Sequence, residues 1–279
     1  MRKLLSAGFA RLWKSMIFWL GMIFMAGFST LAVVDQYWGR IKYPDFSPYP
    51  PDYILFANGT LIPIVIAVFI GIFIGTEYSD GTMRNKLIVG HTRTSIYCSN
   101  FVVCIAASAL MHIAYVTVIL CAGIPLLGKM QTDLTVLFQY FSCSLVIIAA
   151  FTAIFLLISM LIQSKSTGAV AAIIVSLVLL FSAMMINNRL TAPEYYDAYT
   201  YTDDSGNEHT VEAERNPQYL TGTKRQVYEF LWDALPSCQI LQISSQNAEH
   251  LGTLSLYSFA IVILAIPCGT LIFRKKDLK

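Results

Sequence analysis

The chain has 279 residues, of which 56% are hydrophobic and only 13% are charged, and its formal net charge is +2 at pH 7. Its mean hydropathy of +0.60 lies outside the range of soluble globular proteins and within that of integral membrane proteins. This composition excludes a soluble enzyme. We expect membrane lipid as a partner and no nucleic acid.

Residues 1–15 predict an amphipathic helix that lies in the membrane interface. Leu5, Phe9, Leu12 and Trp13 recur at helical spacing, while the basic residues lie off this apolar face or at its edges. A signal peptide is the alternative, but the apolar run that follows is too long and no small-residue cleavage site clearly follows it. We therefore expect an uncleaved interfacial helix.

Six stretches contain no Asp, Glu, Lys or Arg and are long enough to cross a bilayer as a helix. They cover residues 16–34, 53–74, 98–127, 134–162, 168–186 and 254–273. Backbone polar groups inside the hydrocarbon are satisfied only in helices or closed barrels, and continuous apolar runs exclude the barrel. The sequence therefore predicts an all-α integral membrane protein, with transmembrane helices 1–5 within residues 16–186.

The distribution of Lys and Arg predicts which side of the membrane each loop occupies. With the N-terminus inside, twelve of these residues lie in the N-terminal segment, after the second span, at Lys165 and in the C-terminal tail. The short outer loops then hold only three. Because cytoplasmic loops carry the excess of positive charge, we expect both termini to be cytoplasmic.

Residues 76–97, between the second and third spans, are charged and punctuated by glycine. Gly81 permits a tight turn or a helix end, Thr82 can cap a short helix over residues 83–89, and Gly90 can end it. The simplest alternative is a solvated loop whose basic residues only follow the positive-inside rule. A short rigid helix would instead offer a surface on which a soluble protein could dock.

Residues 187–253 form the largest segment between spans, with ten acidic and four basic residues. Its first half alternates aromatic or aliphatic residues with polar ones around residues 204–207, which predicts a β-hairpin or a pair of short strands. We expect a small α+β extracellular insertion here. The last transmembrane helix and a basic cytoplasmic tail follow over residues 254–279.

A helix is predicted in the second half of this insertion. Val227, Phe230, Leu231 and Ala234 recur at helical spacing, and Pro236 ends the pattern. One face of this helix would rest on the membrane or on the hairpin.

No catalytic or metal-binding signature is present in the sequence. The six cysteines have no C-x-x-C spacing and the four histidines are isolated, so we expect no disulfide framework and no metal site. Protease motifs, the serine-hydrolase elbow and the phosphate-binding loop are missing, which predicts a chain that is not an enzyme and binds no cofactor. The spans also lack the acids of ion-coupled transporters, and we interpret His112 as a packing residue rather than a proton relay.

Several short motifs in residues 76–97 and in the tail occur together in one family of membrane proteins. They are Glu77-Tyr78, Gly81-Thr82, Arg84-Asn85-Lys86-Leu87, Gly90 followed by Arg93, and Phe273-Arg274-Lys275-Lys276-Asp277-Leu278. In these motifs and in the order of its elements, the chain resembles the membrane subunits of type 2 ATP-binding-cassette (ABC) transporters. This family of permeases includes bacitracin- and lantibiotic-resistance exporters. The resemblance covers nearly the whole chain.

The resemblance implies a permease subunit of a bacterial plasma membrane. Two such subunits, identical or similar, bind two cytoplasmic ATPase subunits, and the ATPase subunits hold ATP and Mg²⁺. The residues that it assigns to ATPase coupling are Glu77, Tyr78, Gly81, Thr82, Arg84, Asn85, Lys86, Gly90 and Arg93. In this interpretation Glu77 and Arg84 make charge-assisted contacts with the ATPase. The alternative for Glu77 is a local ion pair with Arg84 or Lys86.

The resemblance also implies that the second and fifth spans flank the axis of a dimer. Independently, Gly71, Gly75 and Gly168 belong to small-residue patterns that let helices approach closely. We therefore expect these three glycines at the dimer contact or along the transport pathway.

The large outer insertion departs from the plainest family pattern, in which a short re-entrant element takes its place. Tyr195, Tyr196, Tyr199 and Tyr201 lie close together in this acidic region. Such a surface would attract cationic amphipathic peptides, whereas the alternative is that the tyrosines only pack the hairpin or anchor it at the membrane interface. Together with the family resemblance, which implies export, this surface favours an exporter of an amphipathic or peptide-like substrate over a peptide-binding sensor or immunity protein and over an ion-driven carrier.

Overall fold

The computed structural model describes residues 1–43, 49–203 and 206–276, most of which are helical. Within this part, six helices are long and apolar enough to cross a membrane. They are α2 (Met16–Lys42), α3 (Ile62–Ser79), α5 with its continuation (Arg93–Leu127), α7 (Leu134–Leu161), α8 (Lys165–Leu190) and α11 (Leu251–Lys275). The prediction of an all-α membrane protein with six transmembrane helices is confirmed.

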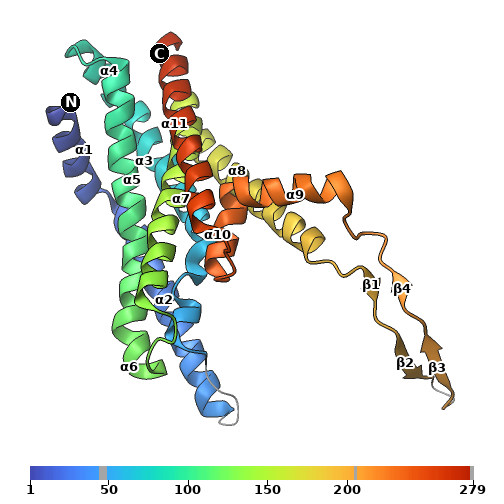
Figure 1. The fold of residues 1–279 in the computed structure, drawn as a ribbon. Helices are drawn as coiled ribbons and strands as arrows, with labels where there is room; N and C mark the ends of the chain where they lie inside the picture. Colours follow the sequence, from blue (N-terminus) through green and yellow to red (C-terminus); the bar gives the residue numbers. More distant parts are fainter. Residues whose placement is uncertain (44–48, 204–205, 277–279) are drawn as a thin grey trace.

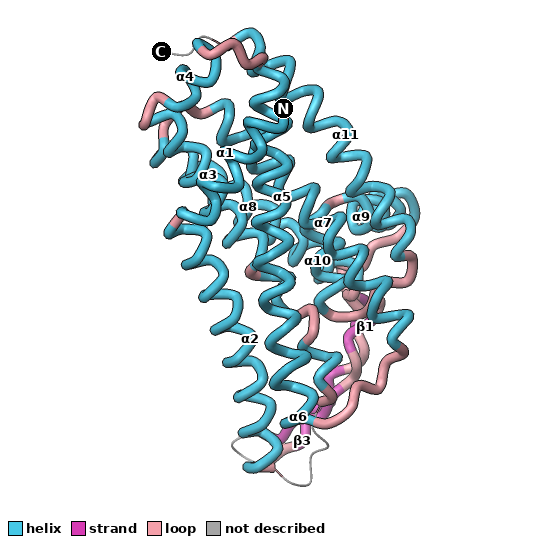
Figure 2. Tube along the Cα trace, turned by 90° about the vertical axis from the view of Figure 1, so that its left-hand side faces the viewer, coloured by secondary structure: helices cyan, strands magenta, loops and turns pink. Residues whose placement is uncertain are grey.

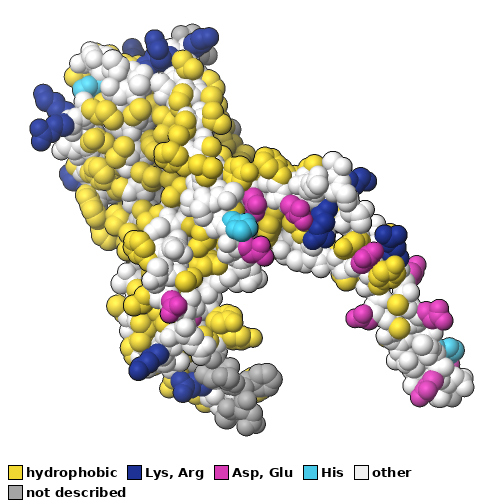
Figure 3. Space-filling model, viewed as in Figure 1, with side chains coloured by type: hydrophobic (Ala, Val, Ile, Leu, Met, Phe, Trp, Pro, Cys, Tyr) yellow, Lys and Arg dark blue, Asp and Glu magenta, His cyan; other side chains and the backbone are white. Residues whose placement is uncertain are grey.

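The six helices form an elongated bundle that has both termini at one end (Figure 1). The N-terminal helix α1 (Arg2–Lys14) and the short helix α4 (Thr82–Ile88) lie at this same end. Figure 3 shows a broad apolar surface over the bundle, with Lys and Arg side chains gathered where the bundle ends. The structure thus brings together the segments that the charge distribution assigned to one side of the membrane.

The third membrane helix changes its geometry near its far end. α5 (Arg93–Val118) continues through one π-helical turn (Ile119–Gly123) into α6 (Ile124–Leu127). Pro125 lies in the first turn of α6 and has no amide hydrogen to donate, so the regular α-helical hydrogen-bond ladder cannot pass through it. The wider turn absorbs this missing bond and keeps the helix continuous.

The interior of the bundle lies around α3 and α7, whereas α2, α8 and α11 leave many apolar side chains exposed. α7 packs against α11, α3 and α5, and α2 lies at the edge of the bundle (Figure 2). His112 on α5 is buried, with Asn58 Nδ2 and Ser144 Oγ each 2.9 Å from one of its ring nitrogens. Both of these partners are neutral, so the geometry favours the packing role.

A hairpin arm projects away from the bundle (Figure 1). Its strands are β1 (Tyr195–Tyr196), β2 (Tyr199–Thr202), β3 (Glu208–Val211) and β4 (Glu214–Arg215). β2 pairs with β3 and β1 pairs with β4, both antiparallel, which confirms the predicted hairpin. Residues 204 and 205, where we predicted its turn, lie outside the described residues.

The predicted helix after the arm is also present, as α9 (Gly222–Ala234), and it ends before Pro236. It packs against α8, α11 and the helix that follows it, and Leu231 and Trp232 contact the cluster around Ile186. Val227 and Phe230, on the predicted apolar face, remain 51% and 56% exposed. The predicted apolar face is therefore divided, with Leu231 against the bundle and with Val227 and Phe230 on the surface.

A further short helix, α10 (Pro236–Ser244), was missed by the sequence analysis. Ile240 and Ile243 are buried against the bundle, and Gln242 Nε2 donates to the Trp232 carbonyl at 2.8 Å. Its polar side chains can enter the interior because they find such partners. Part of residues 187–253 therefore packs against the bundle, a contact that the sequence analysis did not predict.

The second transmembrane helix begins later than predicted. Residues 53–61 form parts of two 3₁₀ turns, η1 (Pro51–Ile54) and η2 (Ala57–Thr60), before α3. Pro63 suits the first turn of a helix, where no amide donor is needed. Gly59 packs so closely on α10 that a Cβ there would lie 2.7 Å from a backbone oxygen of that helix. This contact exists only because α10 folds back onto the bundle.

Candidate functional site

The candidate site is the corner where α3, α4 and α5 meet, at the end of the bundle that carries both termini. Gly81 (φ 67°) separates α3 from α4, and Gly90 (φ 94°) follows α4. Both lie in the left-handed region that glycine adopts without steric cost. The predicted short helix and its glycine boundaries are therefore confirmed.

Thr82 does not cap this helix as predicted. Its hydroxyl donates to the Glu77 carbonyl at 2.9 Å, and the cap position is taken by Gly81. The side-chain cap occurs at the next helix, where Thr92 Oγ1 accepts from the Ser95 amide at 3.2 Å. Thr82 thus fastens the first turn of α4 back onto the end of α3.

Glu77 is the centre of the corner. Its carboxylate is 2% exposed, and Asn100 Nδ2 on α5 donates to its Oε2 atom at 2.9 Å. Lys86 Nζ on α4 forms an ion pair with Oε1, and Arg11 Nη1 on α1 lies 2.5 Å from the same atom. A buried carboxylate is costly unless it is paired and hydrogen-bonded, and here three elements supply the partners.

The contact of Arg11 with Glu77 is a charge contact rather than an aligned hydrogen bond. None of the three guanidinium nitrogens has a hydrogen-bond acceptor among the described residues, although Nη1 is close to the carboxylate. The guanidinium carbon lies 3.7 Å from the centre of the Phe73 ring. Burial lowers the pKa of Arg11, whereas the nearby negative charge of Glu77 raises it. The interaction therefore depends on two charges held in a low-dielectric site.

Two further residues of the predicted coupling segment fix α3 and α5 to other helices. Tyr78 Oη donates to the Met160 carbonyl of α7 at 2.9 Å. Arg93 Nη1 donates to the Phe273 carbonyl of α11 at 2.7 Å and also to the Lys276 carbonyl. Arg93 therefore satisfies carbonyl groups at the C-terminal end of α11, where a positive charge is favoured by the helix dipole.

The outer surface of α4 remains free for a partner. Arg84 and Asn85 are exposed, and Ile88 and Val89 are 71% and 76% exposed. Large apolar side chains of this exposure beside a cation are suited to a protein contact. The sequence analysis identified Arg84 and Asn85 but missed the two apolar residues.

The structure therefore divides the predicted coupling residues into two groups. Glu77, Tyr78, Thr82, Lys86 and Arg93 face the interior of this corner or its neighbouring helices, whereas Arg84 and Asn85 face outward. Glu77 has the local role that we weighed as its alternative, the ion pair with Lys86. Its partners on α1 and α5 were missed, because nothing in the sequence places them near residue 77.

A comparison with protein-family models decides the class of the chain. The model described as "ABC-2 family transporter protein" matches residues 4–183. The chain belongs to this family. It is therefore a membrane permease component of an ABC transporter, and membership implies partnership with separate ABC ATPase subunits. No curated protein matches the chain.

In this ABC-2 permease, the small residues of the second span contact another helix of the same chain. A Cβ at Gly71 would lie 2.5 Å from Ala169 Cα of α8, and a Cβ at Gly75 would lie 2.5 Å from Lys165 Cα. The expected close approach of helices is present, but it joins α3 to α8 of the same subunit. Gly168 is buried and has room, because a Cβ there would lie 3.5 Å from its nearest neighbour.

The four tyrosines that the sequence analysis singled out all lie on the exposed arm of the permease. Tyr195, Tyr196, Tyr199 and Tyr201 are between 49% and 60% exposed. The Tyr199 and Tyr201 ring centres are 6.2 Å apart, and Tyr201 stacks on His209 at 5.3 Å. Tyr196 Oη donates to Asn216 at 3.1 Å. These contacts support the strands while leaving about half of each side chain exposed.

Proposed function

We propose that this ABC-2 permease is the membrane subunit of an ATP-driven bacterial exporter and that α4 is the element on which its ATPase docks. The observation that carries the proposal is the pairing of an exposed α4 surface with a buried ion pair at its base. Arg84, Ile88 and Val89 form the surface, and Lys86 connects it to Glu77.

The contacts at Glu77 supply a route by which a movement of α4 reaches the membrane helices. Lys86, Arg11 and Asn100 hold α4, α1 and α5 against the end of α3. A displaced α4 cannot leave this carboxylate without unpairing buried charges, which costs several kcal/mol. We infer that α3 and α5 move together with α4 as nearly rigid bodies when the ATPase closes.

Co-purification with the ATPase tests this proposal. Arg84→Glu/Ile88→Ser alters only the exposed surface of α4, so we expect a folded permease that loses its ATPase. Arg274→Glu/Leu271→Ser is the matched control, because it makes the same exchange on exposed residues of α11 at the same end of the bundle. If the α4 variant retains the ATPase as well as the control does, the docking role of α4 is wrong.

The side of the membrane is tested separately. An Arg84→Cys variant, in a background with the exposed Cys121 and Cys268 replaced by serine, should resist an impermeant thiol reagent in intact cells and react after permeabilisation. Reaction in intact cells would place α4 outside and would exclude coupling to a cytoplasmic ATPase.

For the substrate we propose a cationic amphipathic peptide, bound first by the arm. The arm carries exposed tyrosines next to acidic side chains, a combination that attracts cations by steering and by cation–π contact. Tyr199→Ser/Tyr201→Ser should weaken binding of a labelled cationic peptide and reduce its stimulation of ATP turnover. Peptide binding without any change of ATP turnover would instead support a sensor or immunity protein. Transport in ATP-free vesicles driven by an ion gradient would support a carrier.

We further propose that a second permease subunit packs against α8. The apolar side chains that line its exposed face recur at helical spacing, and they are Val170, Ile174, Val178, Phe181 and Met185. Disulfide crosslinking of Ile174→Cys subunits tests this contact, and the absence of crosslinked dimers under oxidation would argue against it.

A further inference from the structure

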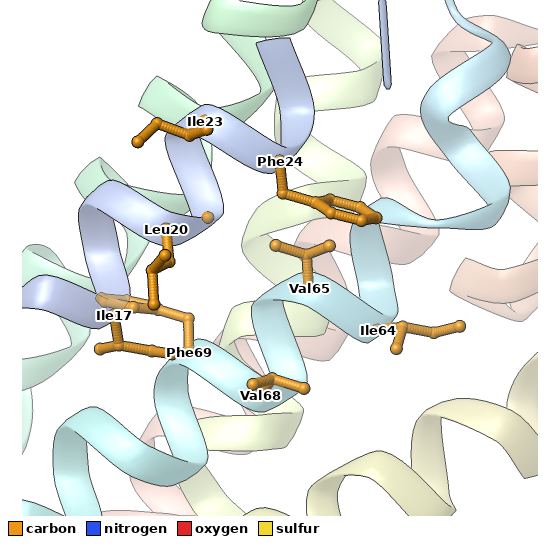
Figure 4. A pocket seen from close by; sticks show the side chains of 9 residues that line it. Ile17, Leu20, Ile23, Phe24, Ile64, Val65, Val68 and Phe69 are labelled. Atoms are coloured by element: carbon orange, nitrogen blue, oxygen red, sulfur yellow. The ribbon is translucent and has the colours of Figure 1, made fainter. Parts of the chain in front are cut away.

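An apolar groove lies between α2 and α3 at the edge of the bundle. Its volume is about 530 Å³. Figure 4 shows Leu20 and Phe24 of α2 facing Val65 and Val68 of α3 across it. All its lining side chains are hydrocarbon, and Gly21 of α2 adds no side chain of its own. The groove is thus suited to a flexible apolar chain.

A second hollow of about 420 Å³ continues the groove toward the end of the bundle that holds both termini. Ile17 and Leu20 line both hollows. Three cations, Arg11, Lys14 and Lys165, line the second hollow, and no acidic residue does. The combined cavity is therefore apolar along its length and positively charged at one end.

The cations at this end outnumber the nearby acids within the described part of the chain, where Glu77 and Asp80 are the acids that act on Arg11. Glu77 is shared between Arg11 and Lys86, so one carboxylate faces two cations there. Lys14 and Lys165 are exposed and form no ion pair with a described acid. Two lysines are therefore free to contact an anion, with the buried charge of Arg11 behind them.

The position of Lys165 is fixed by helix packing. It is the first residue of α8, and its Cα would lie 2.5 Å from a Cβ at Gly75 of α3. The close approach that Gly75 permits brings the start of α8 to the mouth of the groove. The positive end of the α8 helix dipole also lies at this point.

We propose that this cavity binds an anionic phospholipid, with its phosphate at Lys14 and Lys165 and one acyl chain between α2 and α3. Charge complementarity selects this occupant over a second copy of the chain, because a two-fold partner would bring the same cations face to face. The site lies beside the corner around Glu77. Since Arg11 belongs to both, a bound anion would also offset the surplus charge of that corner.

Native mass spectrometry of the full-length chain, without ATPase or ATP, tests the site. The chain in non-ionic detergent is mixed with equal amounts of phosphatidylglycerol and phosphatidylcholine that carry the same acyl chains. We expect phosphatidylglycerol to be retained preferentially. Lys14→Gln/Lys165→Gln should lower this preference about 25-fold, the effect of two lysines near an anionic headgroup.

Two variants control for charge and for the groove. Arg274→Gln/Lys275→Gln removes the same charge from exposed residues of α11 and should leave the preference unchanged. Val68→Trp fills the groove and should reduce binding of both lipids. The proposal is overturned if the two lipids bind equally, or if the lysine variant keeps the preference. It is also overturned if Val68→Trp spares lipid but removes a dimer peak, since the groove would then be a subunit contact. None of these results depends on whether α4 docks an ATPase.

Discussion

Asn100 donates a 2.9 Å hydrogen bond to Glu77 across the contact between α3 and α5, and both side chains are only 2% exposed. The same carboxylate pairs with Lys86 of α4 and Arg11 of α1. A single buried anion therefore holds four helices at the end of the bundle. Substitutions of these buried residues should lower the stability of the permease, whereas substitutions on the exposed surface of α4 should affect only the docking of its partner.

Replacing Glu77 by Gln should destabilise the permease by roughly 3–5 kcal/mol, because it leaves Arg11 and Lys86 without their negative partner. Thermal unfolding in detergent, followed by intrinsic fluorescence, measures the loss. The double variant Glu77→Gln/Arg11→Met should recover part of it, since it removes one uncompensated cation. An unchanged midpoint for Glu77→Gln would contradict the central role of this carboxylate.

Lys86→Glu and Arg84→Glu reverse one charge each on the same short helix and should behave differently. Lys86→Glu brings a second carboxylate against buried Glu77, so its unfolding midpoint should fall as far as that of Glu77→Gln. Arg84 is exposed, so its reversal should change stability by no more than about 0.5 kcal/mol while weakening ATPase co-purification. Equal destabilisation by both variants would show that α4 is placed differently.

Gly71→Ala and Gly75→Ala should each destabilise the subunit by about 1–3 kcal/mol, because the new Cβ would overlap the backbone of α8. Gly27→Ala in α2 is the control, since a Cβ there meets nothing within 4 Å and the exchange gains helix propensity. Unfolding midpoints of the three variants give the comparison. If Gly71→Ala instead dissociated a dimer without lowering subunit stability, the glycine would lie at a contact between subunits.

Arg93→Gln should loosen the end of α11. It removes the guanidinium that caps the Phe273 and Lys276 carbonyl groups, and such charge-assisted bonds contribute about 1.5–3 kcal/mol. Hydrogen–deuterium exchange should accelerate over residues 270–276, and Arg93→Lys should restore part of the protection. Arg84→Gln removes the same charge from α4 and should leave exchange in α11 unchanged. Slow exchange in Arg93→Gln would mean that α11 is held by other contacts.

Local patterns in the sequence were sufficient for the elements of the fold. The six apolar runs, the hairpin, α9 and the glycines that bound α4 were all predicted, because helix length, strand alternation and backbone freedom depend on neighbouring residues. Predictions failed where a distant segment intervened. The start of α3 depends on the packing of Gly59 against α10, and the capping role assigned to Thr82 gave way to a bond with Glu77.

The sequence by itself determined that this protein crosses a membrane six times and that a charged, glycine-bounded helix lies between its second and third spans. Only the tertiary structure decided the partners of the residues on either side of that helix. Glu77 meets Arg11 and Asn100, and Arg93 meets the end of α11, which is 180 residues away. Spacing along a chain carries no information about such pairs. They follow from how whole helices pack, and from the free-energy cost of leaving a charge buried without a partner.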